Sequence, residues 1–275
     1  MPTILQWLTS RFPNASRQTL KRMVANGTVF VDGRPAARLT QIYEDAARVT
    51  LRQPHKSDTA RSPARRPYRI IFEDGDILVV EKPPGLLTST VPREKRPTLL
   101  AMLRRDLAAG QPGARLGLIH RLDRDAGGLL IFSKNNAAYQ SLKRQFFIHS
   151  VGRVYTAIVH GHPNPPAGRI ASRLVERADG TVHSTVNGAR GQLALTHYET
   201  LRRIGQATEL KITLETGRKH QIRVQMAERG HAIVGDATYD KPDAKGLRLW
   251  ATQLSVDHPR TGKRMTFSIA PGFCD

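Results

Sequence analysis

The spacing of hydrophobic and polar residues divides the chain into a short helical N-terminal part and a longer part rich in strands. Near the N-terminus, apolar residues recur three or four positions apart, as on one face of each of two short helices: Leu5, Leu8 and Phe12, then Leu20, Met23 and Val24. Residues 29–31 alternate into Asp32-Gly33, a dipeptide typical of a tight hairpin turn. This part therefore predicts two helices followed by a hairpin.

The rest of the chain shows mostly short alternating stretches, which are typical of strands. The clearest of them cover residues 69–72, 77–80, 129–132, 154–159, 210–214 and 264–269. Helical spacing appears at residues 99–107, 139–146 and 218–229. Because strands outnumber helices and do not alternate regularly with them, we predict an α+β fold whose mainly antiparallel mixed sheet is flanked by helices.

A segment between the two parts has the composition of a linker. Residues 53–67 contain three prolines, four basic residues and no large apolar side chain. The predicted organisation is a small domain at residues 1–52, a linker at 53–67 and a larger domain at 68–275.

Composition narrows the class of protein. The chain has 275 residues, of which 39% are hydrophobic, and no long apolar run, which excludes a membrane-spanning protein. Its single cysteine, Cys274, excludes an internal disulfide or a cysteine-based metal site. The N-terminus lacks the pattern of a signal peptide, so the cytoplasm is the expected compartment.

The charge points to a polyanionic partner. Lys and Arg number 43 against 23 Asp and Glu, a net charge of +20, and residues 1–67 hold 12 of the former and four of the latter. Nucleic acid is the commonest cytoplasmic polyanion. Three cations lie off the apolar face of the second predicted helix, where they could contact phosphates or merely solvate the surface: Arg17, Lys21 and Arg22.

The first candidate for chemistry is a charged loop, residues 119–128, that runs into a hydrophobic strand. Loops anchored on core strands suit reactive groups. Asp123 lies among His120, Arg121 and Arg124, which would keep its carboxylate ionised as a base or nucleophile. A surface salt-bridge cluster is an equally good interpretation of the spacing.

Two further segments carry more polar residues than their surroundings need. Tyr155 begins an apolar strand, where a buried tyrosine is ordinarily core and acquires a function only if its ring faces the Asp123 loop. Arg218, Lys219, His220 and Gln221 form the first turn of the helical pattern at residues 218–229. Cations at a helix N-terminus oppose the helix dipole, so these residues suit a phosphate or carboxylate partner better than a simple salt-bridged helix.

Metal and nucleotide cofactors are not indicated. The sequence has no His-Glu-x-x-His motif, no glycine-rich phosphate loop and no dinucleotide-binding glycine pattern after a strand. We therefore expect a chain that works without a cofactor or bound metal.

Residues 5–8, 16–23 and 27–33 resemble the small RNA-binding domain named after the fourth protein of the small ribosomal subunit. The later segments resemble the RluA family of RNA pseudouridine synthases. The matching stretches, in order, are 81–86, 120–123, Tyr155, 218–224, 231–236 and 258–262. The resemblance covers residues 70–271, and the small basic domain is a frequent companion of that family.

The resemblance implies that uridine within RNA is isomerised by breaking its bond to nitrogen and joining a ring carbon to the same sugar. Asp123 would be the essential carboxylate, either attacking the sugar or removing one of its protons. Arg223 would orient Asp123 and keep it ionised. Tyr155 would stack beneath the uracil and assist the late removal of a proton from carbon five. The uridine must first leave its helix, and Arg121 would fill the vacated space.

The chain departs from the family pattern at three places: Ala126-Gly127 replaces Thr-Ser, Lys219 replaces Thr or Ile, and Gln225 replaces His. Loop hydrogen bonding and substrate choice are affected, whereas the proposed Asp, Tyr and Arg are all present. We expect a monomer acting on large-subunit ribosomal RNA, because of the appended basic domain. The alternatives are the same chemistry on transfer RNA, or a non-catalytic RNA-binding or ribosome-assembly protein.

Overall fold

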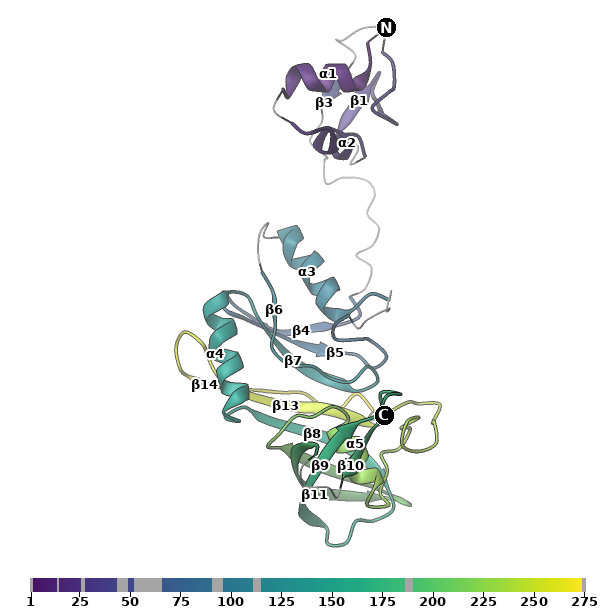
Figure 1. Cartoon of the computed structure of the whole chain (residues 1–275), viewed down its shortest axis with the longest axis vertical. Helices are drawn as coiled ribbons and strands as arrows, with labels where there is room; N and C mark the ends of the chain where they lie inside the picture. Colours follow the sequence, from purple (N-terminus) through teal and green to yellow (C-terminus); the bar gives the residue numbers. More distant parts are fainter. Residues whose placement is uncertain are drawn as a thin grey trace. The chain divides into compact units, whose positions relative to one another are not determined.

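The computed structural model describes residues 2–13, 15–25, 28–43, 49–51, 66–90, 96–110, 115–185 and 190–273. The chain divides into two compact units, residues 1–65 and 66–275, drawn in Figure 1. Apart from its last two residues, the predicted linker at 53–67 lies outside the described residues.

The first unit contains two helices and a three-stranded sheet, ordered β2-β1-β3. Its elements are α1 (Ile4–Arg11), α2 (Arg17–Ala25), β1 (Val29–Val31), β2 (Arg34–Pro35) and β3 (Val49–Leu51). Both residues of the turn between β1 and β2 adopt the left-handed conformation, with φ of 50° at Asp32 and 75° at Gly33. Such a turn matches the twist of a two-residue hairpin. Ile4 and Leu8 of α1 pack with Leu20 of α2 in the core.

The second unit is built on an 11-stranded sheet, with the order β10-β9-β11-β12-β8-β13-β7-β5-β4 and with β14 and β6 paired to β13 and β7 (Figure 1). The strands are β4 (Arg69–Glu73), β5 (Ile77–Lys82), β6 (Gly117–Leu118), β7 (Gly127–Ser133), β8 (Gly152–His160), β9 (Ala167–Glu176), β10 (Val182–Thr185), β11 (Gln192–Ile204), β12 (Ala207–Leu214), β13 (Leu249–Asp257) and β14 (Arg264–Ser268). The helices are α3 (Leu99–Gly110), α4 (Asn136–Phe147) and α5 (Gln221–Ala227). Only β13 and β7 run parallel among the described pairs. The predicted α+β fold with a mainly antiparallel sheet is confirmed.

Alternate residues of the central strands pack on opposite faces of this sheet, as the pleat requires. On one face, Leu130 of β7 shares a cluster with Leu103 of α3 and Ile222 of α5. On the other face, Ile131 shares a cluster with Leu142 of α4. Among the described helices, none has the length and apolar content needed to cross a membrane.

The sequence pattern missed several strands. In β9 and β11, buried apolar residues such as Ile170 and Leu174 are separated by charged or polar residues that face solvent. Strands on the outer part of a sheet need only one apolar face, so their hydrophobic signal is weak. The predicted helix at 218–229 is also wrong in its bounds, because α5 runs only from Gln221 to Ala227.

Candidate active site

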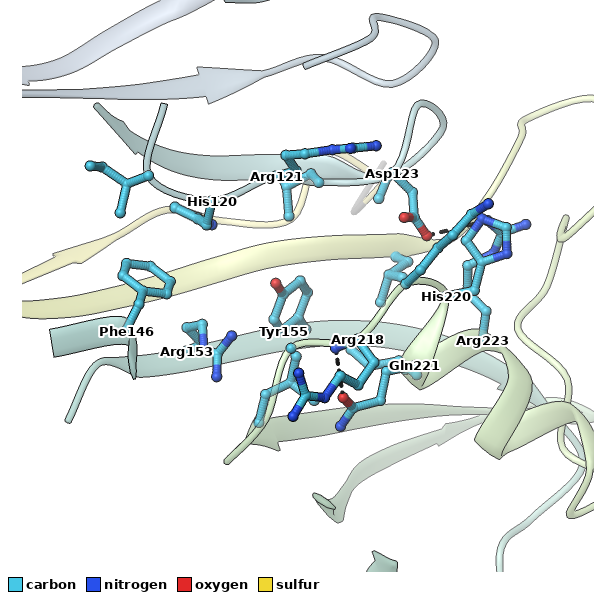
Figure 2. Close-up of a pocket in the computed structure, with 18 of the residues that line it drawn as sticks. His120, Arg121, Asp123, Phe146, Arg153, Tyr155, Arg218, His220, Gln221 and Arg223 are labelled. Atoms are coloured by element: carbon cyan, nitrogen blue, oxygen red, sulfur yellow. Dashed lines mark hydrogen bonds and ion pairs between the residues drawn. The ribbon is translucent and has the colours of Figure 1, made fainter. Parts of the chain in front are cut away.

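A cavity of about 700 Å³ joins the three segments that carry the candidate chemistry. Its lining includes His120, Arg121, Asp123, Arg153, Tyr155, Arg218, His220, Gln221 and Arg223. Figure 2 shows Asp123, His220 and Arg223 at one end, His120, Phe146 and Arg153 at the other, and Tyr155 between them.

The backbone around Asp123 is fixed on both sides. Before it, the buried hydroxyl of Thr88 donates to the Leu122 carbonyl at 2.9 Å and accepts from the Leu122 N–H at 3.3 Å. After it, the fully buried Lys82 ammonium donates to the carbonyl of Arg124 at 2.8 Å. The same ammonium also donates to the carbonyls of Pro83 and Leu86, at 2.8 Å each. The Asp123 carboxylate therefore stands on a loop with little freedom to move.

Lys82 is the only cation among these anchors, and its environment is unusual. Burial lowers its pKa to about 7, against the opposing charges of Asp125 and Asp123. Three carbonyl acceptors match the three N–H donors of an ammonium group. The charged form is therefore the one that satisfies all three carbonyls of the loop.

Arg223, on α5, makes the direct contact with Asp123. Its Nη1 lies 3.2 Å from Oδ2 of Asp123, and its Nε and Nη2 lie 2.7 and 2.6 Å from the two carboxylate oxygens of buried Asp236. Burial alone would lower the pKa of Arg223, but the hydrogen bonds and charge of Asp236, together with Asp123, raise it. Arg223 is thus a fixed cation that orients Asp123.

The other charges near Asp123 do not act as the sequence analysis expects. Arg124 forms a two-point ion pair with Asp125, at 2.9 and 3.0 Å, and is absent from the cavity lining. Burial lowers the pKa of His120 to about 3, so its ring is neutral and its Nε2 accepts the Ile131 N–H at 3.2 Å. The expectation that His120 adds a positive charge beside Asp123 is wrong because its ring is neutral, and the guanidinium of Arg124 is paired with Asp125.

Strand β8 brings two polar side chains to the cavity. Arg153 and Tyr155 are two positions apart and so point to the same face of the strand. Burial raises the pKa of Tyr155, so its hydroxyl stays protonated at neutral pH. The ring shares the cavity with Asp123 (Figure 2), which is the arrangement a functional tyrosine requires.

The segment before α5 differs from the predicted helix N-terminus. Arg218 and Lys219 precede the helix, and His220 occupies the N-cap in the left-handed conformation, with φ of 52°. Gln221 lines the cavity with a buried side chain that accepts the N–H of Arg218 at 2.9 Å and donates to Thr196 at 2.8 Å. It therefore shapes the turn, whereas Arg218 and His220 are only partly buried beside Asp123 and Tyr155.

Gly127, which the family resemblance aligns with a serine, packs directly against the ring of Trp250. A Cβ at this position would lie 2.3 Å from the ring of Trp250 on β13, the strand paired with β7. Within the described residues, Nε1 of Trp250 is buried without a hydrogen-bond partner. The indole fills the space that a side chain at residue 127 would need.

The remaining predicted RNA contacts lie in the first unit. Arg17, Lys21 and Arg22 are exposed on α2, while Leu20 and Val24 of that helix are buried. The three cations therefore form a solvent-facing basic helix surface.

Sequence reasoning missed Lys82, Asp236, Arg153 and Phe146. Arg153 and Tyr155 are two residues apart on a predicted strand, so their side chains share one face. This spacing could have pointed to Arg153 once Tyr155 was a candidate. Phe146 stacks on His120 with ring centroids 4.7 Å apart, a contact with no local sequence signature. Lys82 and Asp236 lie in the family-like stretches 81–86 and 231–236, which is the signal that could have pointed to them, but their roles depend on a burial that the sequence does not show.

A group of Asp74, Asp76 and His258 has the composition of a metal site but is already satisfied internally. Asp74 accepts the N–H groups of Asp76 and Ile77 at 2.8 Å each and pairs with His258 at 2.8 Å. Arg260 pairs with Asp76 at 2.8 Å. These contacts describe a structural ion-pair cluster.

The geometry supports acid–base or nucleophilic chemistry centred on one carboxylate. Asp123 is oriented by Arg223 and is about one-quarter exposed, so a reacting group could reach it from the cavity. A buried aromatic ring provides a flat apolar wall opposite. Such a cavity suits a planar, uncharged group attached to an anionic chain.

Comparison with known proteins points in the same direction. Residues 76–228 match the family model described as RNA pseudouridylate synthase. The chain is 32% identical to "Uncharacterized RNA pseudouridine synthase" of Aquifex aeolicus, over 96% of this chain and 88% of that protein. It is 31% identical to "Ribosomal large subunit pseudouridine synthase D" of Zymomonas mobilis, over 94% of this chain and 87% of that one. The solved structure "Human RNA Pseudouridylate Synthase Domain Containing 4" has the same fold, with a TM-score of 0.63 and 21% identity over 74% of this chain and 88% of that one.

Proposed function

The chain belongs to the RNA pseudouridine synthase family, and on that premise we propose that it converts uridine to pseudouridine in large-subunit ribosomal RNA, with Asp123 as the essential carboxylate. Membership makes the chain an isomerase that acts on RNA. The observation that carries the assignment of the site is the 3.2 Å contact between Arg223 and Asp123 in a cavity shared with Tyr155.

The reaction rearranges one nucleotide without adding or removing atoms overall. The bond between C1′ of the ribose and N1 of uracil breaks, the base turns, and C1′ joins C5. The proton on C5 is then lost, and N1 gains a proton. Asp123 either attacks C1′ or removes a ribose proton in the first step; both roles need the ionised carboxylate that the fixed charge of Arg223 stabilises.

Other cavity residues support this chemistry through position and charge. Tyr155 forms the wall against which the uracil stacks, and its hydroxyl, which burial keeps protonated, assists the loss of the C5 proton by hydrogen bonding and not as the base itself. Arg121 is exposed at the cavity and can enter the space that the extruded uridine leaves in the RNA. Arg218 and His220 contact the substrate strand, and Gln221 positions them through its hydrogen bond to Arg218.

Ribosomal RNA is the proposed substrate for two reasons. Relatives of this chain carry the name of large-subunit pseudouridine synthase. The first unit also presents Arg17, Lys21 and Arg22 on one exposed helix surface, and we assign it as a small RNA-binding domain that holds phosphates. A ribosomal substrate implies the cytoplasm as the place of action.

Release of tritium from RNA labelled at C5 of uracil tests the catalytic assignment. Unmodified transcripts of large-subunit ribosomal RNA and of transfer RNA serve as parallel substrates. We expect the wild type to release tritium from the ribosomal transcript, and Asp123→Asn to release none above background. Asp125→Asn is the matched control, because Asp125 is the neighbouring carboxylate, is absent from the cavity lining and pairs with Arg124.

Undiminished release by Asp123→Asn would remove Asp123 from the reaction. Release from the transfer RNA transcript alone would redirect the substrate assignment. Mapping pseudouridines in cells with and without the gene would then locate the modified position.

The role of the first unit is tested by deleting residues 1–52. We expect weaker binding to the ribosomal transcript and a shallower dependence of log Kd on log salt concentration, because phosphate contacts release counterions. An unchanged affinity and slope would show that this unit does not bind the RNA.

A further inference from the structure

The last residue of helix α4 places an aromatic ring where folding does not need one. Phe147 is 83% exposed and lines the same cavity as Asp123. The other large hydrophobic residues exposed in the described part of the chain do not line this cavity: Ile42, Ile70, Ile148, Leu193, Leu201 and Ile204. A single exposed apolar side chain is ordinary on a surface, whereas one in the wall of a basic cavity suggests a ligand.

The pattern of α4 confirms that Phe147 is not a core position. The helix buries Ala138, Leu142 and Gln145, at the spacing of one face. Phe147 falls four residues after exposed Lys143 and so shares the solvent face with it. A polar residue at position 147 would fold equally well.

The end of α4 holds this ring on a rigid support. His149 takes the left-handed conformation, with φ of 58°, and the N–H of Ser150 donates to the Gln145 carbonyl at 3.0 Å. This arrangement closes the helix directly after Phe147. The ring is therefore presented by a defined helix end, as a preorganised binding surface requires.

Phe146, the neighbouring aromatic residue, is occupied within the protein. It stacks on His120, and the guanidinium of Arg153 lies 5.6 Å from the centre of its ring. The distance from His120 to Phe146 is 4.7 Å between ring centroids. Of the two rings at the end of α4, Phe147 is the one that remains open to a ligand.

Arg153 and Arg218 are among the cations of this cavity that have no carboxylate partner in the described part of the chain. Within the described residues, the hydrogen bonds of both guanidinium groups go to backbone carbonyls, and Nε of Arg218 donates to the Leu193 carbonyl at 3.0 Å. Arg153 is 9% exposed, donates through Nη2 to the Glu215 carbonyl at 3.0 Å and has no partner for its Nε. A Cβ at residue 217 would lie 2.3 Å from Nη1 of Arg153, so the glycine makes room for this guanidinium. Buried charges are normally paired, and an incoming anion would provide the missing partner.

We propose that Phe147 is a stacking platform for an RNA base next to the target uridine, and that Arg153 and Arg218 receive a phosphate of the same strand. This inference rests on the proposed function, because it assumes an RNA strand in the cavity. Figure 2 shows Phe146 and Arg153 at the end of the cavity away from Asp123, and Phe147, which follows Phe146 in the chain, also lines this cavity. Stacking on an aromatic ring tolerates any base. The platform therefore adds affinity and fixes the position of the RNA strand along the cavity.

Binding is measured with the unmodified ribosomal and transfer RNA transcripts, in an Asp123→Asn background that prevents turnover. We expect Phe147→Ala to raise Kd by about five- to 150-fold, the loss of one base–aromatic stack. The slope of log Kd against log salt should stay unchanged, because stacking releases no counterion, while Arg218→Gln should reduce that slope by about one. Phe147→Leu should bind as weakly as Phe147→Ala, and Phe147→Tyr should restore the parental Kd.

Ile148→Ala is the matched control, because Ile148 is the adjacent exposed residue of the same helix end and does not line the cavity. We expect it to bind like the parent. Parental binding by Phe147→Ala or by Phe147→Leu would overturn the platform, as would an equal loss in Ile148→Ala. A dimer that Phe147→Ala dissociates in sedimentation would also overturn it, by showing that the ring joins two copies of the chain.

The same variants separate this inference from the proposed function. Binding that depends on Phe147, with no tritium release by the wild type, would remove the catalytic proposal and keep the platform. If the wild type releases tritium and Phe147→Ala binds RNA as tightly as its parent, the catalytic proposal stands and the platform is overturned. A parent that binds neither transcript would overturn the platform.

Discussion

Asp236 holds the guanidinium of Arg223 at two points, 2.7 Å from Nε and 2.6 Å from Nη2, and so leaves Nη1 free to meet Asp123 at 3.2 Å. Both members of the Asp236–Arg223 pair are buried, at 1% and 5% exposure. The planar fork of arginine matches a carboxylate at two points, which a lysine could not do. Asp236 is thus a positioning residue for the carboxylate that it does not touch.

Replacing Asp236 tests this relationship. Asp236→Asn leaves the buried charge of Arg223 without its main partner, which we expect to lower the free energy of unfolding by about 3–5 kcal/mol. Misplacement of Arg223 should also lower kcat for tritium release by about a hundredfold at a temperature where circular dichroism shows the variant to be folded.

Asp257→Asn is the control for that variant. Asp257 pairs with Arg264 at 3.2 Å, and both side chains are nearly half exposed. Exposed pairs contribute at most about 1 kcal/mol, so the control should keep both stability and kcat. Equal behaviour of the two variants would contradict the positioning role of Asp236.

Lys82→Met tests whether the loop after Asp123 must be tied down. The apolar side chain fits the space but leaves the carbonyls of Pro83, Leu86 and Arg124 without their donor. We expect a loss of about 1–3 kcal/mol in the free energy of unfolding, measured in urea. We also expect a fall of up to about a hundredfold in kcat, because the Arg124 carbonyl adjoins Asp123.

Lys134→Met separates the two effects. Lys134 is also largely buried, donates to the Asp74 carbonyl at 2.6 Å and is absent from the cavity lining. It should lose stability to a similar degree and keep its kcat. A normal kcat in Lys82→Met would show that the loop holds its geometry without the ammonium.

Gly127→Ser tests the steric exchange between residue 127 and Trp250. The new Cβ would overlap the indole, so we expect a loss of about 1–3 kcal/mol in the free energy of unfolding. In a Trp250→Leu background the same substitution should cost less, because the smaller side chain vacates that space. A double-mutant cycle measured by urea unfolding gives the coupling.

Gly75→Ala is the control for added volume at a glycine. Its new Cβ would meet only the far end of the Arg260 side chain, at 3.2 Å, and, beyond its two chain neighbours, no backbone atom within 4 Å. The variant should lose little stability. Additive effects of Gly127→Ser and Trp250→Leu would show that the two positions do not exclude each other.

The neutral state of His120 predicts a dependence of stability on pH. Its pKa falls from the ordinary 6.5 to about 3 on folding, because burial disfavours the charged ring. Between these values the unfolded chain binds a proton that the folded chain does not, so the free energy of unfolding decreases as pH falls, by up to about 1.4 kcal/mol per pH unit.

His120→Gln removes this titrating group and keeps an acceptor for the Ile131 N–H. Unfolding in urea from pH 7.5 to 4.5 should show a shallower slope for the variant below pH 6.5 and equal slopes above it. The same steep decrease in both proteins would mean that His120 does not titrate in this way.

Much of the fold could be predicted from local pattern. The sequence pattern predicts the strands that have a continuous apolar run, such as β5 and β7. It also predicts the helices that have a clear buried face, such as α4. Strands β9 and β11 did not, because their charged residues face solvent and the apolar ones are too widely spaced to form a signal. The predicted start of α5 is too early because His220 takes the left-handed conformation, which the helical spacing of the sequence does not reveal.

The sequence by itself determined the class of fold and the presence of Asp123, Tyr155 and Arg223 in three separate motifs. It also determined the excess of positive charge that suits an RNA substrate. The family resemblance implied that Arg223 pairs with Asp123, whereas only the tertiary structure brings its Nη1 to 3.2 Å across 100 residues of sequence and commits Arg124, the next residue, to Asp125. The side chains of adjacent residues point in different directions, so the residue next to Asp123 in sequence need not contact its carboxylate. The contacts in the active site therefore depend on how β7, β8 and α5 pack against one another. Local sequence patterns do not encode that packing.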